Sequence, residues 1–508
     1  MVLPFPTFPV ICAFLLFLFM VTKLVIKTKV TKNSTPKLPP GPWKLPFIGN
    51  IHHLLGSPPH QSLADLAKKY GPLMQLQLGE VSFVVVSSAE VAKEVMKTHD
   101  TNFAQRPHFL GPSIITYDCI DITFSPYGTY WSQLRKICTM ELLSPKRVQS
   151  FRSIREEEVS DLIKTISLTG NSPINLTEQI FLLTFSIISR AVVGKKFRDK
   201  QQFVSTIEQF LGLSSGFTIA DMHPSIKVLE LMNGLRPKLE KLHQQVDRMI
   251  ENIIQAHRTE AIASQLSSGE GEEDLMYVLL KIQEQGSLDF PLSDTILKAV
   301  ILDMLTAGSH TSSSSVEWAF SELLKNPNLM EEAQAEVRRV FDRKGTVDET
   351  GIHELKFLKS VIKETLRLHP PLCLNPRESI TSCEINGYII PAKTKILINI
   401  WAIGRDPKYW IQAESFNPKR FLDSSIDCRG LDFEYIPFGS GRRICPGISF
   451  ALANIELVLA QLLYHFDWEL ASGLKPEQLD MTEANGLTIS KKENLHLIPI
   501  PYHPSFVE

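Results

Sequence analysis

The segment PFGSGRRICPG, residues 437–447, is followed at once by the apolar run ISFALANIELVLAQLLYHF, residues 448–466. The three glycines of the first segment let the backbone turn closely around Cys445, because glycine adopts conformations that other residues avoid. The spacing of apolar residues in the second segment predicts a core helix, whose positive dipole end points toward the cysteine sulfur. The two segments together predict a tight loop that presents one cysteine at the start of a buried helix.

Three kinds of site are compatible with such a loop. A thiolate that binds haem iron needs backbone N–H groups near the sulfur and apolar walls, which Gly439, Gly447 and Phe438 can provide, and Arg443 can pair with a haem propionate. A buried free cysteine before a core helix is the plain alternative. A dinucleotide site fails on spacing, because GxGxxG requires a glycine where Ile444 stands.

The loop also matches a family pattern. Phe438, Gly441, Arg443, Cys445 and Gly447 reproduce FxxGxRxCxG, and on this basis the chain resembles the cytochrome P-450 family. The resemblance implies haem b with Cys445 as the axial ligand of the iron. It also implies a mainly α fold with small β-sheets and a single large catalytic domain.

A second motif of that family lies upstream. Glu364 and Arg367 in KETLRLHPP stand three residues apart, which places them on one helical face. By resemblance they form the structural ExxR pair, joined by Arg420 of FNPKRF. Lys419 departs from the usual PERF pattern but leaves the arginine in place.

Further residues resemble binding partners of the haem propionates. Trp131 and Arg135 in WSQLRK are one helical turn apart and resemble the WxxxR pair of the family. Arg377 in NPRE resembles another propionate partner. These are cofactor-binding roles, not chemical ones.

The segment LDMLTAGSHTSSSS, residues 302–315, resembles the family's oxygen-activation motif (A/G)Gx(D/E)T(T/S), which implies a long helix over the distal side of the haem. Ala307 and Gly308 are small enough to let oxygen and substrate approach, and the Thr311 hydroxyl can hold protons that O–O cleavage consumes. His310 stands where the family usually has Asp or Glu. Imidazole can relay protons, so we expect altered proton delivery and less coupled turnover.

Composition excludes several other classes. The 53 basic and 55 acidic side chains leave a formal charge of -2, which gives no support to nucleic-acid binding. The seven cysteines are scattered without a CxxC pair, so we expect neither a disulfide framework nor a structural zinc site. The same pattern indicates that the protein works in a reducing compartment.

The start of the chain differs from the rest. Residues 1–26 are apolar with no charge before Lys23, and lysines follow, an order that predicts a transmembrane signal anchor with a cytosolic body rather than a cleaved signal peptide. Residues 27–50 form a basic and proline-rich hinge, and residues 51–508 the catalytic domain. We therefore expect a single-pass protein of the endoplasmic reticulum membrane, in contact with lipid, whose sequons at Asn33 and Asn175 are not glycosylated.

Periodicity predicts mostly helices. A candidate β-hairpin is formed by residues 73–79 and 82–88. An Asn-Gly turn lies within residues 384–391, and an extended segment covers residues 496–501. An exposed connector is predicted at residues 264–275. Helical spacing is present in residues 88–99, 130–143, 153–168, 235–260, 292–325, 329–342, 353–368 and 448–466.

The resemblance is strongest to plant members that modify specialised metabolites. It implies a monooxygenase that uses O2 and electrons from an NADPH-cytochrome P-450 reductase, which carries the flavins that this chain lacks. The segments expected to contact substrate, 109–122, 302–309, 372–375 and 486–488, are mostly apolar, so a sesqui-, di- or triterpene is the first choice.

Several alternatives stay open. The substrate could be a flavonoid or an alkaloid. The protein could be a haem-thiolate isomerase or dehydratase that needs no O2, or a haem sensor or carrier without catalysis. Candidates for a basic face that docks the reductase are Lys136, Lys146, Arg147 and Arg442, with ordinary solvated charge as the alternative.

Overall fold

The computed structural model describes residues 37–196, 200–213, 218–232, 234–265, 274–286, 288–484 and 486–502. The predicted membrane anchor, the sequon at Asn33 and most of the predicted connector 264–275 lie outside these residues. The other sequon residue, Asn175, caps a helix, since its side chain accepts a hydrogen bond from Glu178 N at 3.3 Å.

The described chain is mainly helical with small sheets. The α-helices are α2 (Pro59–Tyr70), α3 (Ala89–Lys93), α4 (Leu110–Ile115), α5 (Thr129–Glu141), α6 (Pro145–Ser150), α7 (Arg152–Leu168), α8 (Leu176–Val193), α9 (Lys200–Leu213), α10 (Ile219–Met222), α11 (Leu229–Met232), α12 (Leu235–Gln265), α13 (Leu275–Gln285), α14 (Asp294–Lys325), α15 (Pro327–Phe341), α16 (Lys356–Leu368), α17 (Ile400–Ile403) and α18 (Ile448–His465). The strands are β1 (Leu73–Leu78), β2 (Val81–Val86), β3 (Ile174–Asn175), β4 (Leu374–Glu378), β5 (Cys383–Ile385), β6 (Tyr388–Ile390), β7 (Lys395–Asn399), β8 (Phe466–Leu470) and β9 (His496–Pro501).

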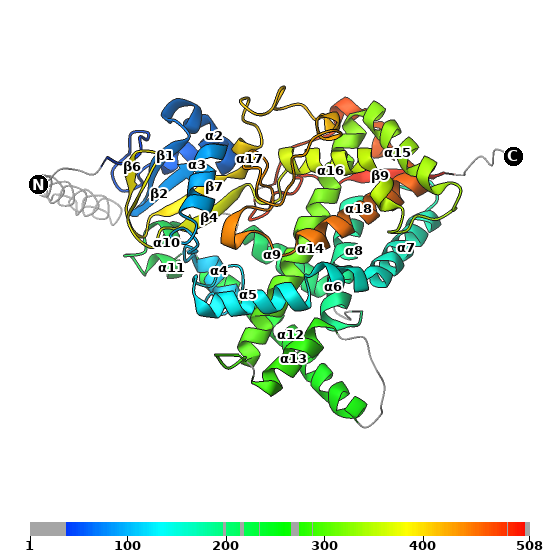
Figure 1. Ribbon diagram of the computed structural model, residues 1–508, viewed down its shortest axis with the longest axis horizontal. Helices are drawn as coiled ribbons and strands as arrows, with labels where there is room; N and C mark the ends of the chain where they lie inside the picture. The colour runs from blue at the N-terminus through cyan, green and yellow to red at the C-terminus, as the bar shows by residue number, and fades with distance from the viewer. Residues whose placement is uncertain are drawn as a thin grey trace, which may run out of the picture.

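The strands form three sheets at the edges of the helical body. The largest has the order β1-β2-β7-β4, in which only β2 and β7 are parallel. A second sheet has the order β3-β9-β8, and β5 and β6 form a hairpin. Figure 1 shows the four-stranded sheet on one side of the molecule and α15, α16 and α18 on the other.

Helix α14 runs through the middle of the molecule and packs against α8, α16 and α18 (Figure 1). Its approach to α8 requires glycine at position 308, because a Cβ atom there would lie 2.9 Å from Ile188 Cγ1. The Ser293 hydroxyl caps the N-terminus by accepting a hydrogen bond from Ile296 N. The fold is therefore organised around one long buried helix.

The proline-rich segment runs without regular structure from Lys37 to Lys44 and then turns tightly, with Leu45 and Gly49 hydrogen-bonded to each other. It contains no helix between Lys37 and Asn50, and it lies along β1, where Gln75 N donates to Pro40 O at 2.7 Å. The Asn50 amide joins the two, since it donates to Trp43 O at 2.8 Å and accepts from Gln77 N at 2.8 Å. The start of the catalytic body is thus fixed to the large sheet.

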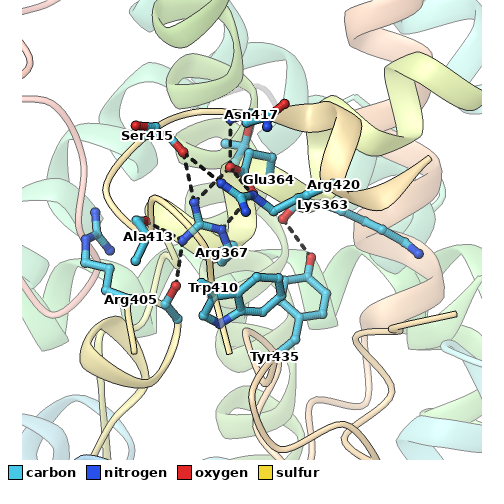
Figure 2. A network of polar contacts seen from close by, with 12 residues as sticks. Lys363, Glu364, Arg367, Arg405, Trp410, Ala413, Ser415, Asn417, Arg420 and Tyr435 are labelled. Atoms are coloured by element: carbon cyan, nitrogen blue, oxygen red, sulfur yellow. Dashed lines mark hydrogen bonds and ion pairs between the residues drawn. The ribbon is translucent and has the colours of Figure 1, made fainter. Parts of the chain in front are cut away.

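The predicted structural triad is a buried polar network (Figure 2). The Arg367 guanidinium donates two hydrogen bonds to the Glu364 carboxylate, at 2.7 and 2.8 Å, and Arg420 Nε donates a third at 2.9 Å. Arg367 also donates to the carbonyls of Gly404 and Ala413, and its guanidinium lies 5.2 Å from the Trp410 ring centroid, a cation–π contact. One carboxylate therefore binds two arginines and fixes the loop before the cysteine segment.

Two predicted helices differ in detail from the observed ones. Residues 353–368 do not form one helix: a 3-10 turn, Ile352–Glu354, ends at Leu355, and α16 then begins, capped by the Glu336 carboxylate, which accepts from Phe357 N and Leu358 N. The helix predicted at 88–99 is α3 followed by a π-helical turn, Glu94–Thr98.

Two described helices, α8 and α18, are long and apolar enough to span a membrane by composition alone. Most of each is buried inside the protein, 72% and 61% of the respective windows. Both are therefore explained as core helices.

Glu364→Ala leaves the Arg367 guanidinium buried without its counter-charge, so we expect a loss of about 3–5 kcal/mol in the free energy of unfolding, or no folded protein. Urea unfolding of the full chain measures this. The matched control is Glu332→Ala, which removes the partially exposed ion pair with Lys419 and costs less than about 1 kcal/mol. Equal effects of the two variants would contradict a structural role for the network.

Candidate active site

The cysteine loop is closed by backbone hydrogen bonds. Cys445 N donates to Phe438 O at 3.0 Å, which brings Phe438 alongside the cysteine, and α18 begins three residues later. Burial raises the pKa of the Cys445 thiol, while the Gly447 N–H and the Arg135 guanidinium act to lower it. Cys445 is a half-buried residue, and of these effects burial is the largest, so the pKa of its thiol is raised overall.

The loop packs closely against the π-helical turn Glu94–Thr98. Gly441 has a φ of +70°, and a Cβ atom there would lie 2.2 Å from Met96 O. Arg442 N donates to the Asp100 carboxylate at 2.9 Å. Only glycine fits at 441, so this residue sets the path of the backbone toward Cys445.

Four arginines from separate parts of the chain surround this loop. Arg443 donates to the backbone carbonyls of Ala104, Ile122 and Ser125, at 2.9, 3.2 and 2.6 Å. The cluster consists of Arg106, Arg135 on α5, Arg377 on β4 and Arg443. Three of these four were predicted as propionate partners.

The arginine cluster lacks a full set of partners. Burial lowers the pKa of all four guanidinium groups, and the neighbouring arginines lower those of Arg377 and Arg443 further. Arg377 is 2% exposed, and its Nε and Nη1 atoms have no hydrogen-bond partner within the described residues. Buried cations that repel one another require an anion, and the two carboxylates of haem suit them. The donor set therefore fits haem, with Cys445 as ligand.

Trp131 and Arg135, predicted as a propionate-binding pair, link α5 to the loop in this structure. Arg135 Nη2 donates to Ile444 O, and its guanidinium lies 5.4 Å from the Trp131 ring centroid. Trp131 Nε1 donates to Ile122 O at 2.9 Å, and Arg443 lies over the same ring at 4.1 Å. The Trp131 indole ring thus contacts two of the cluster's cations.

On α14 the predicted residues divide between two faces. Ala307 is exposed and Thr311 half-buried, whereas the helix from Ser312 to Leu324 is buried. The Thr311 hydroxyl donates to Ala307 O at 2.7 Å. Gly308 faces Ile188 on α8, so the structure gives it a packing role. Ala307 and Thr311 are thus one helical turn apart on a less buried face of α14.

The hydroxyl groups of this part of α14 bond back to its own carbonyls. Ser309 Oγ donates to Leu305 O at 2.6 Å, and Ser315 Oγ donates to Thr311 O at 2.9 Å. The serine-rich sequence is therefore compatible with a continuous helix, because its side chains use backbone acceptors.

His310 contacts the C-terminal loop. Its Nδ1 lies 2.6 Å from Thr488 Oγ1, and its ring meets Phe181 edge-on at a centroid distance of 5.4 Å. Burial lowers the pKa of His310 to about 4. The imidazole is therefore neutral near pH 7. Ser314 Oγ, which donates to Ile489 O at 2.6 Å, helps to hold the loop here.

The structure adds residues that the sequence analysis did not single out as site residues. Arg106 donates to Asn375 Oδ1 at 2.9 Å, although Asn375 lies 269 positions away in the sequence. It also donates to Thr123 O at 3.1 Å, 17 positions away. Asp303 on α14 accepts from Ile122 N at 2.8 Å. No local motif marks these contacts, because their partners are distant in sequence.

The chain is similar to known proteins over most of its length. The chain matches the family described as Cytochrome P450 over residues 39–498. It is 56% identical to cytochrome P450 71D10 of Glycine max (96% of each chain), and 51% identical both to premnaspirodiene oxygenase of Hyoscyamus muticus and to tabersonine 16-hydroxylase 2 of Catharanthus roseus (97% of each chain).

A solved structure shares the fold. A zebra fish cytochrome P450 with abiraterone aligns with a TM-score of 0.75 at 23% identity, over 88% of this chain and 100% of that one. The predicted mainly α fold with small sheets is confirmed. With a cysteine loop, an arginine cluster and a family match over nearly the whole described chain, this protein belongs to the cytochrome P450 family, whose members are haem-dependent monooxygenases.

Proposed function

We propose that the chain inserts one atom of O2 into a hydrophobic plant terpenoid, a sesqui-, di- or triterpene, at haem bound through Cys445. The observation that carries the haem site is the buried arginine cluster beside the cysteine loop. The substrate class rests on the apolar character of the predicted contact segments and on the relative named for oxygenation of premnaspirodiene. The relative named for tabersonine keeps an alkaloid as the alternative.

The proposed mechanism assigns each residue a task. Bound haem supplies the redox chemistry by which O2 and two electrons from NADPH give a hydroxylated product and water. Cys445 would ligate the iron, and Arg106, Arg135, Arg377 and Arg443 would hold the propionates. The Thr311 hydroxyl, which donates to Ala307 O, would hold and pass protons.

The electrons are proposed to come from a reductase on the same membrane. Lys136, an exposed residue, and Arg442 line a pocket of about 350 Å³ with Trp131 and Arg135, next to the cysteine loop. The location supports these two residues as docking candidates. Lys146 is also exposed, but Arg147 is half-buried and its side chain is less available.

Location in the endoplasmic reticulum membrane, with the catalytic domain in the cytosol, is part of the same proposal. Several apolar side chains near the start of the described chain are exposed, among them Trp43 at 63% and Leu55 at 73%. An apolar surface beside the predicted anchor supports contact with lipid.

The proposed function is tested by expression with a plant NADPH-cytochrome P-450 reductase in microsomes, using terpene, flavonoid and alkaloid panels and labelled O2. A terpenoid product with one labelled oxygen atom supports the proposal. Turnover without NADPH or O2 would favour an isomerase or dehydratase instead.

Cys445→Ser is expected to abolish activity and the Soret band typical of thiolate ligation in the reduced, carbon monoxide-treated protein, because a serine hydroxyl does not replace the thiolate. Cys383→Ser changes another half-buried free cysteine and is the matched control. This variant is expected to keep both the activity and the Soret band. Retention of the band in Cys445→Ser would contradict the assigned ligand.

His310→Asp is expected to raise the product formed per NADPH consumed by about twofold or more, because a carboxyl group can hold the Thr488 hydroxyl and exchange a proton at once. Product and NADPH are measured in the same reaction. Ser313→Ala is the control, since its hydroxyl binds only the His310 carbonyl. Unchanged coupling in His310→Asp would refute altered proton delivery.

Lys136→Glu and Arg442→Glu are expected to slow reduction by the reductase by about three- to tenfold, with a weaker dependence on salt, because each reverses a charge on the proposed docking face. Stopped-flow reduction under carbon monoxide measures the rate. Lys475→Glu, at another exposed lysine, should match the wild type. If all three variants were reduced at the same rate, Lys136 and Arg442 would not belong to the surface that docks the reductase.

A further inference from the structure

The C-terminal loop, residues 486–490, is fastened to α14 by side chains on one face of that helix. His310 Nδ1 lies 2.6 Å from Thr488 Oγ1. One helical turn further along, Ser314 Oγ donates to Ile489 O at 2.6 Å. Residues four apart lie on the same face of a helix, so these contacts follow one stripe along α14.

The inner end of the loop is held through its backbone. Trp318 Nε1, one more turn along the same stripe, donates to Ile489 O at 3.3 Å. The Trp318 ring is fully buried and stacked on His369 at a centroid distance of 4.1 Å, which fixes it in place. From the other side, Pro371 O accepts from Ile489 N at 2.9 Å. Ile489 is therefore fixed between α14 and the segment that leads to β4.

The outer end of the loop, residues 486–488, depends on one side chain. Of these three residues only Thr488 has a polar side chain, and its hydroxyl is paired with His310. The backbone is tightly folded here, because a Cβ atom at Gly486 would lie 2.7 Å from Thr488 O. A displacement of Thr488 therefore displaces Gly486 and Leu487 with it.

The imidazole of His310 is itself held by packing. Its ring meets the Phe181 ring of α8 edge-on, with 81° between the two planes and 5.4 Å between the centroids. Burial lowers the pKa of His310 to about 4, so the imidazole is neutral near pH 7, and its contact with Thr488 needs no counter-charge. A neutral ring in a fixed orientation can hold the hydroxyl in one place.

This contact lies beside the predicted catalytic turn of α14. Thr311 follows His310 directly, and its hydroxyl donates to Ala307 O at 2.7 Å. The contact with His310 therefore fixes residues 486–488 relative to the turn that carries Ala307 and Thr311.

We propose that His310 is a positioning residue that determines specificity: by holding the Thr488 hydroxyl, it keeps residues 486–488 in place as one wall of the substrate site. This role rests on the proposed function, in which these residues contact substrate, and it is separate from proton delivery. Without the contact, only a fraction of the molecules has the wall in place. The apparent affinity for a bulky ligand then falls by that fraction.

The test is a spectral titration of the full, haem-loaded protein with two nitrogen ligands of haem iron, imidazole and the bulky azole clotrimazole. Imidazole is too small to need the wall, so it measures access to the iron alone. Thr488→Val keeps the shape of the side chain but loses the hydroxyl. In this variant the dissociation constant of clotrimazole should rise by about three- to tenfold, the effect of one lost hydrogen bond, while that of imidazole changes by less than about twofold.

Two matched variants test whether the hydroxyl at 488 is responsible. Thr488→Ser restores a hydroxyl and should bind clotrimazole as the wild type does. Thr482→Val makes the same change at an exposed threonine shortly before the loop, whose hydroxyl binds Asp480, and should leave both dissociation constants unchanged.

A double-mutant cycle tests whether His310 acts through Thr488. His310→Phe keeps an aromatic ring against Phe181 but removes the nitrogen that contacts the hydroxyl. His310→Phe, alone or combined with Thr488→Val, should weaken clotrimazole binding by the same factor as Thr488→Val, because both changes remove one contact. If His310→Phe does not bind haem, the comparison of Thr488→Val with Thr488→Ser still decides.

Hydrogen exchange of peptides covering residues 484–492 needs no substrate, so it separates a failure of this role from a failure of the proposed function. Exchange should be faster in Thr488→Val than in the wild type and in Thr482→Val. An unchanged dissociation constant of clotrimazole in Thr488→Val, or effects that multiply in the double variant, would overturn the role of His310. If the expected results are obtained but no terpenoid is oxidised, the positioning role stands and only the proposed substrate class fails.

Discussion

Four guanidinium groups buried within reach of one another are the constraint on which the site depends. Arg377 is almost fully buried with two N–H-bearing atoms that lack partners within the described residues. Buried cations destabilise a fold unless an anion lies among them. Where an anion is present, the low dielectric constant of the protein interior strengthens its attraction to the cations. An anionic group bound among these arginines would therefore also stabilise the loops that carry them.

The chain contains a second polar network that is complete in itself. Glu364 lies between Arg367 and Arg420, and the remaining donors of Arg367 reach backbone carbonyls (Figure 2). This network fixes the loop that leads to the cysteine segment and needs no ligand. One network thus holds the scaffold, whereas the arginine cluster is built for an occupant.

The long amphipathic elements could be predicted from the sequence, since helices such as α14 and α15 carry apolar residues at helical spacing. Helix α8 was not predicted, because its residues are apolar on nearly all sides and show no helical period. Strand β7 was not predicted, because it is only five residues long. The motifs located Cys445, Arg443, Trp131 and Arg135, which the structure brings together. Arg106 escaped prediction, because its partner Asn375 is 269 positions away. Thr488 lies in a predicted substrate-contact segment, but its pairing with His310, 178 positions away, was not predicted.

The back-bonded hydroxyls of α14 have a mechanical consequence. Carbonyls that accept from a side chain as well as from the helix backbone tolerate a change in local curvature, since a lengthened backbone hydrogen bond is compensated by the hydroxyl. The same bond recurs deeper in the helix, where Ser321 Oγ donates to Glu317 O at 2.8 Å, so a small bend at these positions need not leave a backbone carbonyl without a donor.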